Sequence, residues 1–154
     1  TEFELIKGRA GRIAFDYVVK CLARSVCEMT ARINGRKDDS IRIQETAHLV
    51  GESARAALIS HIALREDARA EIYNTLTGDA PHARGHVDCK EIVLGRARAK
   101  AVPIVEVNEP TAHVTHEAAI GSVDSRQLQT LLSRGLDEDE ATELIIEGML
   151  SKRC

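Results

Sequence analysis

Aromatic residues are scarce in this 154-residue sequence, which has two Phe, two Tyr and no Trp, or 3% of the chain. Compact β-sandwich and barrel cores use several large rings to fill their volume. The apolar residues here are mainly Ala, Val, Ile and Leu, and they predict a core of another kind. The shortage of rings also weighs against a carbohydrate-active enzyme, which needs paired acids along a groove and usually aromatic platforms for the sugar.

Long apolar runs and a one-sided charge are also absent. No run approaches the roughly 20 residues that span a bilayer, and no signal peptide is recognisable, so we expect a cytoplasmic protein without a membrane partner. The net charge is −3, with both signs spread along the chain, which excludes a basic surface for nucleic acid. Because the first residue is Thr rather than Met, we expect a fragment or a processed form.

Two motifs of enzymes and metal sites are missing. The four cysteines, Cys21, Cys27, Cys89 and Cys154, show no C-x-x-C spacing, and we expect reduced thiols. No G-x-x-x-x-G-K-[ST] loop is present to hold the phosphates of ATP, so this chain is not expected to hydrolyse it. We therefore expect a protein that is not an enzyme.

An alanine recurs ahead of short apolar segments. It stands at Ala54, Ala68, Ala83, Ala99 and Ala112, with spacings of 14, 15, 16 and 13 residues. Weak self-similarity at a nearly fixed step is typical of a solenoid whose unit is a short strand and a turn, and two units give coils of roughly 30 residues. We predict a mainly β fold, a right-handed parallel β-helix, over residues 1–121. An ordinary β-sandwich with coincidental alanine spacing is the alternative.

The first third of the chain contains one clear strand pattern and one ambiguous segment. Alternation in "IAFDYVV" places four residues on one side of a strand, namely Ile13, Phe15, Tyr17 and Val19. The segment 16–29, "DYVVKCLARSVCEM", also satisfies a helical template. Both readings stay open for it.

Residues 122–154 change to a helical pattern. Asp124 is a plausible N-cap with Gln127 three residues on, and Gly135 supplies the left-handed residue that ends a helix. A second helix begins at Asp137, with Glu140 at the third position. The expected apolar stripes are Leu128, Leu131 and Leu132 on the first helix and Ala141, Leu144, Ile145 and Met149 on the second. Such a pair either covers the end of the solenoid or binds a partner.

Four blocks of the C-terminal half carry a resemblance: "GHVDCKEIVLG", "AVPIVEV", "AHVTHEAAIGSVDSRQL" and "LLSRGLDEDEATELIIEGML". In order and spacing they resemble the C-terminal part of the SufB/SufD family, the scaffold of the SUF iron-sulfur cluster assembly machinery. The resemblance implies a β-helix that handles a transient iron-sulfur cluster at a dimer interface. The implied partners are a SufC-type ABC ATPase, bound by residues 122–154, and a second SufB/SufD-type chain in a homodimer or heterodimer.

Three residues receive roles through this resemblance. Cys89 matches the cysteine that accepts sulfur, Glu117 matches a cluster or iron ligand, and His116 matches a counterpart ligand across the interface. A thiolate suits the first role, because it is both a nucleophile and a soft iron ligand. Without the resemblance, Cys89 is more simply a small buried hydrophobe. Adjacent strand residues point to opposite faces, so His116 and Glu117 share a site only if the backbone turns there.

The spacing of these residues predicts a pairing. Glu117 follows Cys89 by 28 residues, close to one coil of the repeat, which places its carboxylate in the layer above the thiol. Thr115 stands where SufB-like members carry an acid, and "AIGSVD" is more SufD-like, so the subfamily stays open. A carbohydrate-active β-helix enzyme and a non-catalytic structural module are the alternative functions.

The remaining cysteines and histidines are expected to play no part. If Cys21 and Cys27 lie on a strand, they point the same way but far apart, and Cys154 is terminal. Four histidines are read as surface or turn residues: His48, His61, His82 and His86. Two ligands three residues apart, His86 and Cys89, do not make a zinc site without others.

Overall fold

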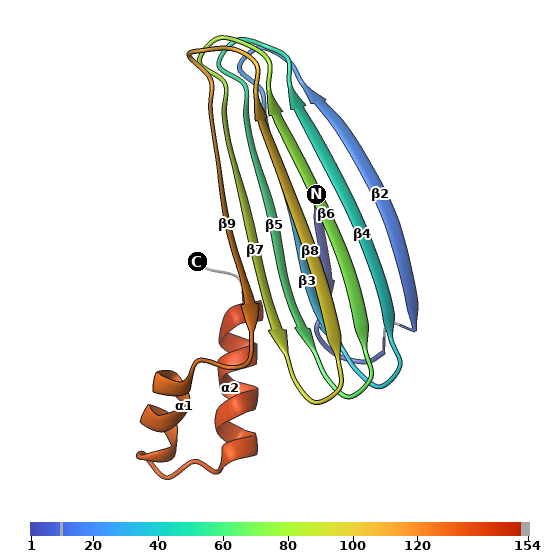
Figure 1. The fold of residues 1–154 in the computed structure, drawn as a ribbon, viewed down its shortest axis with the longest axis vertical. Helices are drawn as coiled ribbons and strands as arrows, with labels where there is room; N and C mark the ends of the chain where they lie inside the picture. The colour runs from blue at the N-terminus through green and yellow to red at the C-terminus, as the bar shows by residue number, and fades with distance from the viewer. Residues whose placement is uncertain (10, 152–154) are drawn as a thin grey trace.

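The computed structural model describes residues 1–9 and 11–151, and these form nine strands followed by two helices (Figure 1). The strands are β1 Glu2–Leu5, β2 Arg12–Cys21, β3 Val26–Gly35, β4 Ser40–Leu49, β5 Arg55–Leu64, β6 Arg69–Gly78, β7 Arg84–Val93, β8 Arg98–Val107 and β9 His113–Gly121. The helices are α1 Ser125–Leu132 and α2 Glu138–Leu150. The ambiguous segment is therefore extended chain on either side of the turn between β2 and β3.

The strands form two parallel sheets that face one another. One has the order β1-β3-β5-β7-β9 and the other β2-β4-β6-β8, and each strand pairs in parallel with the strand two places along the chain. The two sheets run in opposite directions, as Figure 1 shows, because every coil goes up one sheet and down the other. The predicted parallel β-solenoid is confirmed, and the sandwich alternative is wrong.

The repeat length follows from the strand register. The first coil advances the chain by 28 residues, since Arg12 pairs with Ser40. Every later coil advances it by 29, since Ser40 pairs with Arg69 and Arg69 pairs with Arg98. The repeating alanines are the buried residues at the inner corners of the turns, Ala54, Ala68, Ala83, Ala97 and Ala112. Ala99 was therefore the wrong fourth member of the series. It lies within β8, paired with Ala70, and not at a turn.

Alternation along each strand sends every second side chain into the space between the sheets. Ile43, Leu58, Ile72 and Leu76 are fully buried there. Ile13, Phe15 and Val19 are half-buried on the same side of β2, as the alternation in that strand predicted. The interior is thus mainly a stack of aliphatic side chains, and the four aromatic rings lie in the first coil or on the outer surface.

The two helices are capped as the sequence indicated. Asp124 accepts a hydrogen bond from the Gln127 amide, and Asp137 and Glu140 form a capping box at the start of α2. Gly135 has φ +94°, the left-handed conformation that glycine adopts without steric cost. Among the described residues, no helix is long and apolar enough to cross a membrane.

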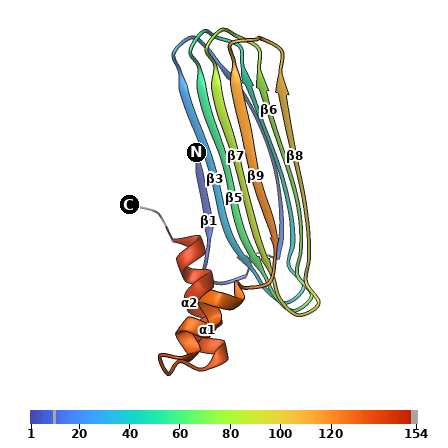
Figure 2. The same ribbon diagram turned by 60° about the vertical axis from the view of Figure 1, so that its left-hand side comes forward.

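Helix α2 lies against the outer surface of the first sheet, beside the ends of its strands (Figure 2). Ile146 and Leu150 are buried against Ala63, with Ile92 and Leu94 alongside. The pair does not cover the β8–β9 end of the solenoid, contrary to the capping alternative. The predicted stripe on α2 is partly wrong, because the buried residues are Ala141, Ile146 and Leu150, whereas Leu144 is 48% exposed.

Candidate functional site

The central residues of β7 point alternately into and out of the solenoid. Val87, Cys89 and Glu91 point inward and are all buried, whereas Asp88 and Lys90 lie on the outer surface. The in-register neighbours on β5 agree, since Leu58, Ser60 and Ile62 pair with the three inward residues and are fully buried. Cys89 and Glu91 therefore occupy the same interior face.

The Cys89 thiol is enclosed by the interior. Its exposure is 0%, and Sγ lies 3.3 Å from Oδ1 of Asn74 on β6, in the opposite sheet. Burial, aided by the nearby carboxyls of Glu91, Asp88 and Glu45, raises the pKa of Cys89 to about 12. At neutral pH the thiol is protonated, so nucleophilic or iron-binding chemistry requires removal of this proton when the incoming group arrives.

A row of buried polar groups leads away from this thiol through the interior. The Asn74 amide nitrogen lies 2.7 Å from Oε2 of Glu45 and 3.4 Å from the Ser60 hydroxyl. Glu45 is 2% exposed, and burial raises its pKa to about 7 despite hydrogen bonds from Ser60 and Asn74. The sequence analysis did not predict this row. The available signal was a polar residue at an inward, otherwise apolar position near the middle of each of β4, β5 and β6.

Glu91 is a second buried carboxyl, and sequence reasoning missed it as well. It is 2% exposed, and neither carboxyl oxygen has a hydrogen-bond partner among the described residues. Burial, with a contribution from Asp88, raises its pKa to about 7. Buried carboxyls without partners are uncommon, because the charged form loses its hydration without compensation. Glu91 therefore offers a free interior oxygen donor two residues from Cys89.

Glu117 does not meet Cys89 in this chain. In the β7–β9 ladder, Cys89 pairs with Ala118, and Glu117 pairs with Asp88 on the outer surface. The Glu117 side chain is 62% exposed and lies 3.6 Å from the Lys90 ammonium. The predicted placement above the thiol is wrong because the coil has 29 residues rather than 28, and a shift of one residue moves a strand side chain to the other face.

His116 points the other way from Glu117. It pairs with the inward residue Val87, so it lies on the inner face of β9, diagonally next to Cys89 along the two strands. It is nonetheless exposed, because β9 is the last strand of its sheet. The backbone does not turn at this point, and the two adjacent residues serve different surfaces.

On the outer surface, the Asp88 carboxylate contacts two basic side chains. His61 Nε2 lies 3.0 Å from the Asp88 carboxylate, and Lys90 Nζ lies 3.2 Å from it. Burial alone would raise the pKa of Asp88, but hydrogen bonds from His61 and Lys90 outweigh it and lower the pKa. The other His61 nitrogen lies 3.2 Å from the Met149 carbonyl oxygen at the end of α2. His61 is therefore a structural link between sheet and helix rather than a simple surface residue.

The inner face carries a sulfur, an oxygen and a nitrogen that are candidate iron donors, from Cys89, Glu91 and His116. These atom types suit iron that must later be released, because an all-thiolate set holds it more tightly. Within residues 1–9 and 11–151, however, no three His, Cys, Asp or Glu side chains are close enough to hold a metal ion.

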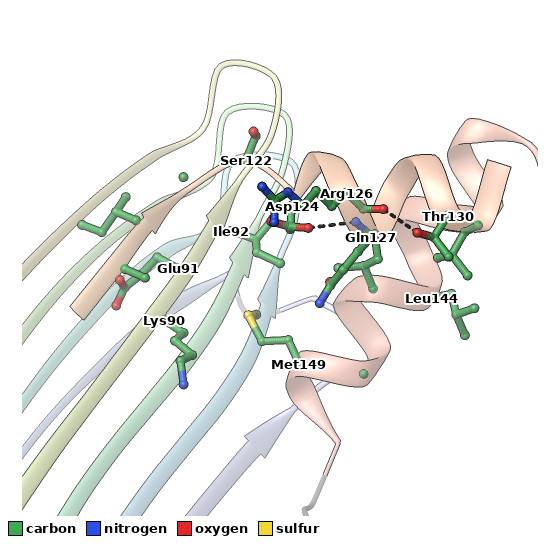
Figure 3. A pocket seen from close by; sticks show the side chains of 16 residues that line it. Lys90, Glu91, Ile92, Ser122, Asp124, Arg126, Gln127, Thr130, Leu144 and Met149 are labelled. Carbon is green, nitrogen blue, oxygen red and sulfur yellow. Dashed lines mark hydrogen bonds between the residues drawn. The ribbon is translucent and has the colours of Figure 1, made fainter. Parts of the chain in front are cut away.

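A groove runs between the helix pair and the edge of the first sheet (Figure 3). Its volume is about 860 Å³. The apolar part of the lining includes Ile92, Ile120, Leu131, Leu144 and Met149, and the polar rim includes Asp124, Arg126 and Gln127. Helix α1 has no fully buried residue: in its apolar stripe, Leu128 and Leu131 are half-buried and Leu132 is exposed, and Leu131 lines the groove.

Comparison with known proteins gives one consistent result. Residues 16–149 match the model of the SufBD core domain of SUF system FeS cluster assembly. The chain is 40% identical over 150 residues to an iron-sulfur cluster assembly SufBD family protein of Methanocaldococcus jannaschii, covering 97% of this chain and 48% of that protein. It is 40% identical over 151 residues to a SufBD family protein of Pyrococcus horikoshii, covering 98% of this chain and 46% of that one.

The chain spans about half the length of these curated relatives. The matched region nonetheless includes most of both sheets and nearly all of the helix pair, so the likeness extends over the whole architecture described above. The chain belongs to the SufBD family of the SUF iron-sulfur cluster assembly system.

Proposed function

We propose that this chain is a scaffold subunit of the SUF system and takes part in iron-sulfur cluster assembly in the cytoplasm. The observation that carries the proposal is the position of Cys89, an interior thiol on the strand next to the last strand of its sheet in a SufBD-type solenoid. The chain would act as a support for chemistry driven by another protein and not as an enzyme itself. The two alternative functions, a carbohydrate-active enzyme and a non-catalytic structural module, would not require this thiol.

The β8–β9 end of the solenoid supports a dimer. These two strands are the outermost strands of their sheets, and each pairs on one side within the described residues. Their free N–H and C=O groups can pair with another edge strand. His116 and Ile120 are exposed on the inner face of β9, where a second SufB/SufD-type chain would cover them. The partner is a copy of this chain or a related chain.

The cargo would be a transient iron-sulfur cluster assembled at that junction. Cys89 would receive sulfur and bind iron, and His116 would approach from the exposed layer. Glu117 stays a predicted ligand, although its outward direction requires donors from the partner or a shift of β9. Glu91 is the carboxyl already placed on the inner face with the thiol.

The helix pair would bind the SufC-type ATPase. The groove beside α1 and α2 exposes apolar side chains within a polar rim, the composition typical of a protein interface. Leu131 and Leu144 line it from different helices, and neither is buried in the chain itself. Their replacement should therefore leave the fold intact.

The first experiment captures the SufC-type ATPase with this chain. The Leu131→Glu/Leu144→Glu variant is expected to lose at least about tenfold in affinity, because charged side chains in an apolar contact are strongly disfavoured. Leu132→Glu is the matched control, since Leu132 is exposed on α1 but does not line the groove. Absence of binding by the unmodified chain would contradict the ATPase role.

A second experiment tests cluster assembly. Anaerobic incubation with iron and sulfide should produce charge-transfer absorbance in the unmodified chain, and Cys89→Ser should abolish it. Cys21→Ser is the control, because Cys21 is equally buried but lies in the first coil. Equal absorbance from the unmodified chain and the Cys89→Ser variant would favour the alternative of a non-catalytic structural module.

A further inference from the structure

The structure brings together two cysteines that the sequence appeared to separate. Cys21 is the last residue of β2 and Cys27 is the second residue of β3, on either side of one turn. Both point into the solenoid, since Cys21 pairs with the buried Leu49 and Cys27 pairs with the buried Ala56 of the next coil. The chain reverses between them, so their inward side chains approach from opposite sheets.

The two sheets converge at this corner in the following coils as well. The positions equivalent to the two cysteines are Gly78 and Gly85 two coils further on. A Cβ added to Gly85 would lie 3.3 Å from the side chain of Leu49, on the other sheet. A Cβ added to Gly78 would lie 3.0 Å from the side chain of Val114 on β9. Inward side chains here meet across the interior, and in the first coil those side chains are thiols.

The two thiols belong to one apolar cluster. Burial raises the pKa of Cys21, and the neighbouring Cys27 thiol adds to this rise. Cys21 is 2% exposed, whereas Cys27 is half-buried. A cavity of about 410 Å³ opens beside the pair and is lined by both cysteines together with Lys20 and Glu28. A small reagent can therefore reach Cys27 first.

We propose that Cys21 and Cys27 are a redox-active dithiol, which a low-molecular-weight disulfide converts reversibly into an intramolecular disulfide. The Cys27 thiolate attacks one sulfur of the reagent, breaks its S–S bond and releases one small thiolate. The Cys21 thiolate then attacks the Cys27 sulfur, forms the protein disulfide and releases the second small thiolate. The protein loses two electrons and two protons, and the reagent gains them as two thiols.

The order of the two attacks follows from exposure. Cys27 borders the open cavity, whereas Cys21 lies behind it in the apolar cluster. Burial also raises the pKa of Cys21, which keeps it from reacting with the reagent directly. Cys89 takes no part, because it lies on β7 in a later coil. The dithiol is thus independent of the cluster-assembly role proposed above.

The test uses the full chain carrying Cys154→Ser, equilibrated with mixtures of oxidised and reduced glutathione under mildly alkaline conditions. Remaining thiols are then alkylated, and the product is analysed by intact mass and peptide mapping. We expect a species lighter by two hydrogen atoms, with Cys21 and Cys27 linked in one peptide. Reduced dithiothreitol should reverse it completely.

Single variants separate the two steps. With Cys21→Ser, the glutathione adduct on Cys27 has no resolving thiol and should accumulate at least about tenfold over the parent chain. With Cys27→Ser, Cys21 should stay unmodified, and Cys89→Ser should leave the linked species unchanged. Persistent glutathione adducts on the parent chain, a link that includes Cys89, or the absence of any oxidation would each overturn the proposal.

Discussion

The Cys89 thiol and the Asn74 carboxamide face one another across the solenoid interior, with Sγ 3.3 Å from Oδ1. They come from opposite sheets and are both fully buried. The same carboxamide lies 2.7 Å from Glu45, so Asn74 connects the thiol of the candidate site to a buried carboxyl in the coil below. This link underlies the first prediction.

Asn74→Leu should destabilise the fold, because it removes the closest hydrogen-bond donor to the buried Glu45 carboxyl. Loss of one partner of a buried polar pair costs about 2–4 kcal/mol in free energy of unfolding. Urea unfolding followed by circular dichroism measures it. The Glu45→Leu/Asn74→Leu double variant should lose less than the single variant, since no unpaired polar group is left. A single variant as stable as the parent would contradict the link.

Glu45 and Glu91 should make stability depend on pH. Burial raises the pKa of each to about 7 from the ordinary value of 4.5 for glutamate. Between these values the unfolded chain releases protons that the folded chain retains, so stability falls as pH rises and levels off above about pH 7. Each group contributes about 3 kcal/mol to this fall.

The pH dependence is best measured as a difference between the parent chain and Glu91→Gln. The free energy of unfolding of each protein is measured at about pH 5 and about pH 8. Between these values the variant should become more stable than the parent by up to about 3 kcal/mol, because only the parent loses the contribution of Glu91. Comparing variants cancels the opposite contribution of Asp88, whose lowered pKa adds stability that is lost on acidification. Parallel curves for the two proteins would show that Glu91 is not desolvated.

His61 should hold the end of α2 to the sheet. Its two ring nitrogens face the Asp88 carboxylate and the Met149 carbonyl oxygen, both hydrogen-bond acceptors. Arg32 and Lys90 flank it on the neighbouring strands, and the Asp88 charge offsets them. His61→Gln should weaken docking of α2 by about 1–2 kcal/mol.

Hydrogen exchange of the α2 amides measures this docking. Faster exchange is expected in α2 and not in the strands of the second sheet. His48→Gln is the matched control, because His48 bonds a neighbouring side chain, Thr77, on the outer surface of that sheet. Unchanged exchange in α2 would show that the buried Ile146 and Leu150 hold it without His61.

Gly51 and Gly148 should respond in opposite ways to substitution by alanine. A Cβ on Gly51 would lie 2.0 Å from the backbone nitrogen of Ala23 in the turn of the neighbouring coil, so one coil would have to move. Gly51→Ala should cost about 3 kcal/mol or more. Gly148→Ala meets nothing within 4 Å in α2 and should gain up to about 1 kcal/mol. Thermal unfolding of the two variants tests both signs.

Local sequence patterns predicted most of the fold. The alanine repeat indicated a two-strand coil, and the caps at Asp124 and Asp137 located both helices, because these signals act over a few residues and need no knowledge of distant contacts. Packing on α2 was less predictable. Its apolar stripe was predicted from helical spacing alone. Packing against the sheet buries Ile146 and Leu150, whereas Leu144 lines the groove.

The candidate site depended on register, which a repeat with uneven spacings does not define to one residue. A 29-residue coil puts Glu117 outside beside Lys90, and a 28-residue coil would have put it above Cys89. Glu91 was overlooked for a related reason, since its face could not be assigned until β7 was paired.

The solenoid, the helix pair and membership of the SufBD family could be predicted from the sequence, because short-range patterns and the order and spacing of its blocks carry that information. Only the tertiary structure decided which side chains share the interior, including Cys89 with Glu91 and Cys21 with Cys27. The physical reason is the pleat of the strand, which sends neighbouring residues to opposite faces, so that a single residue of register separates a buried group from an exposed one.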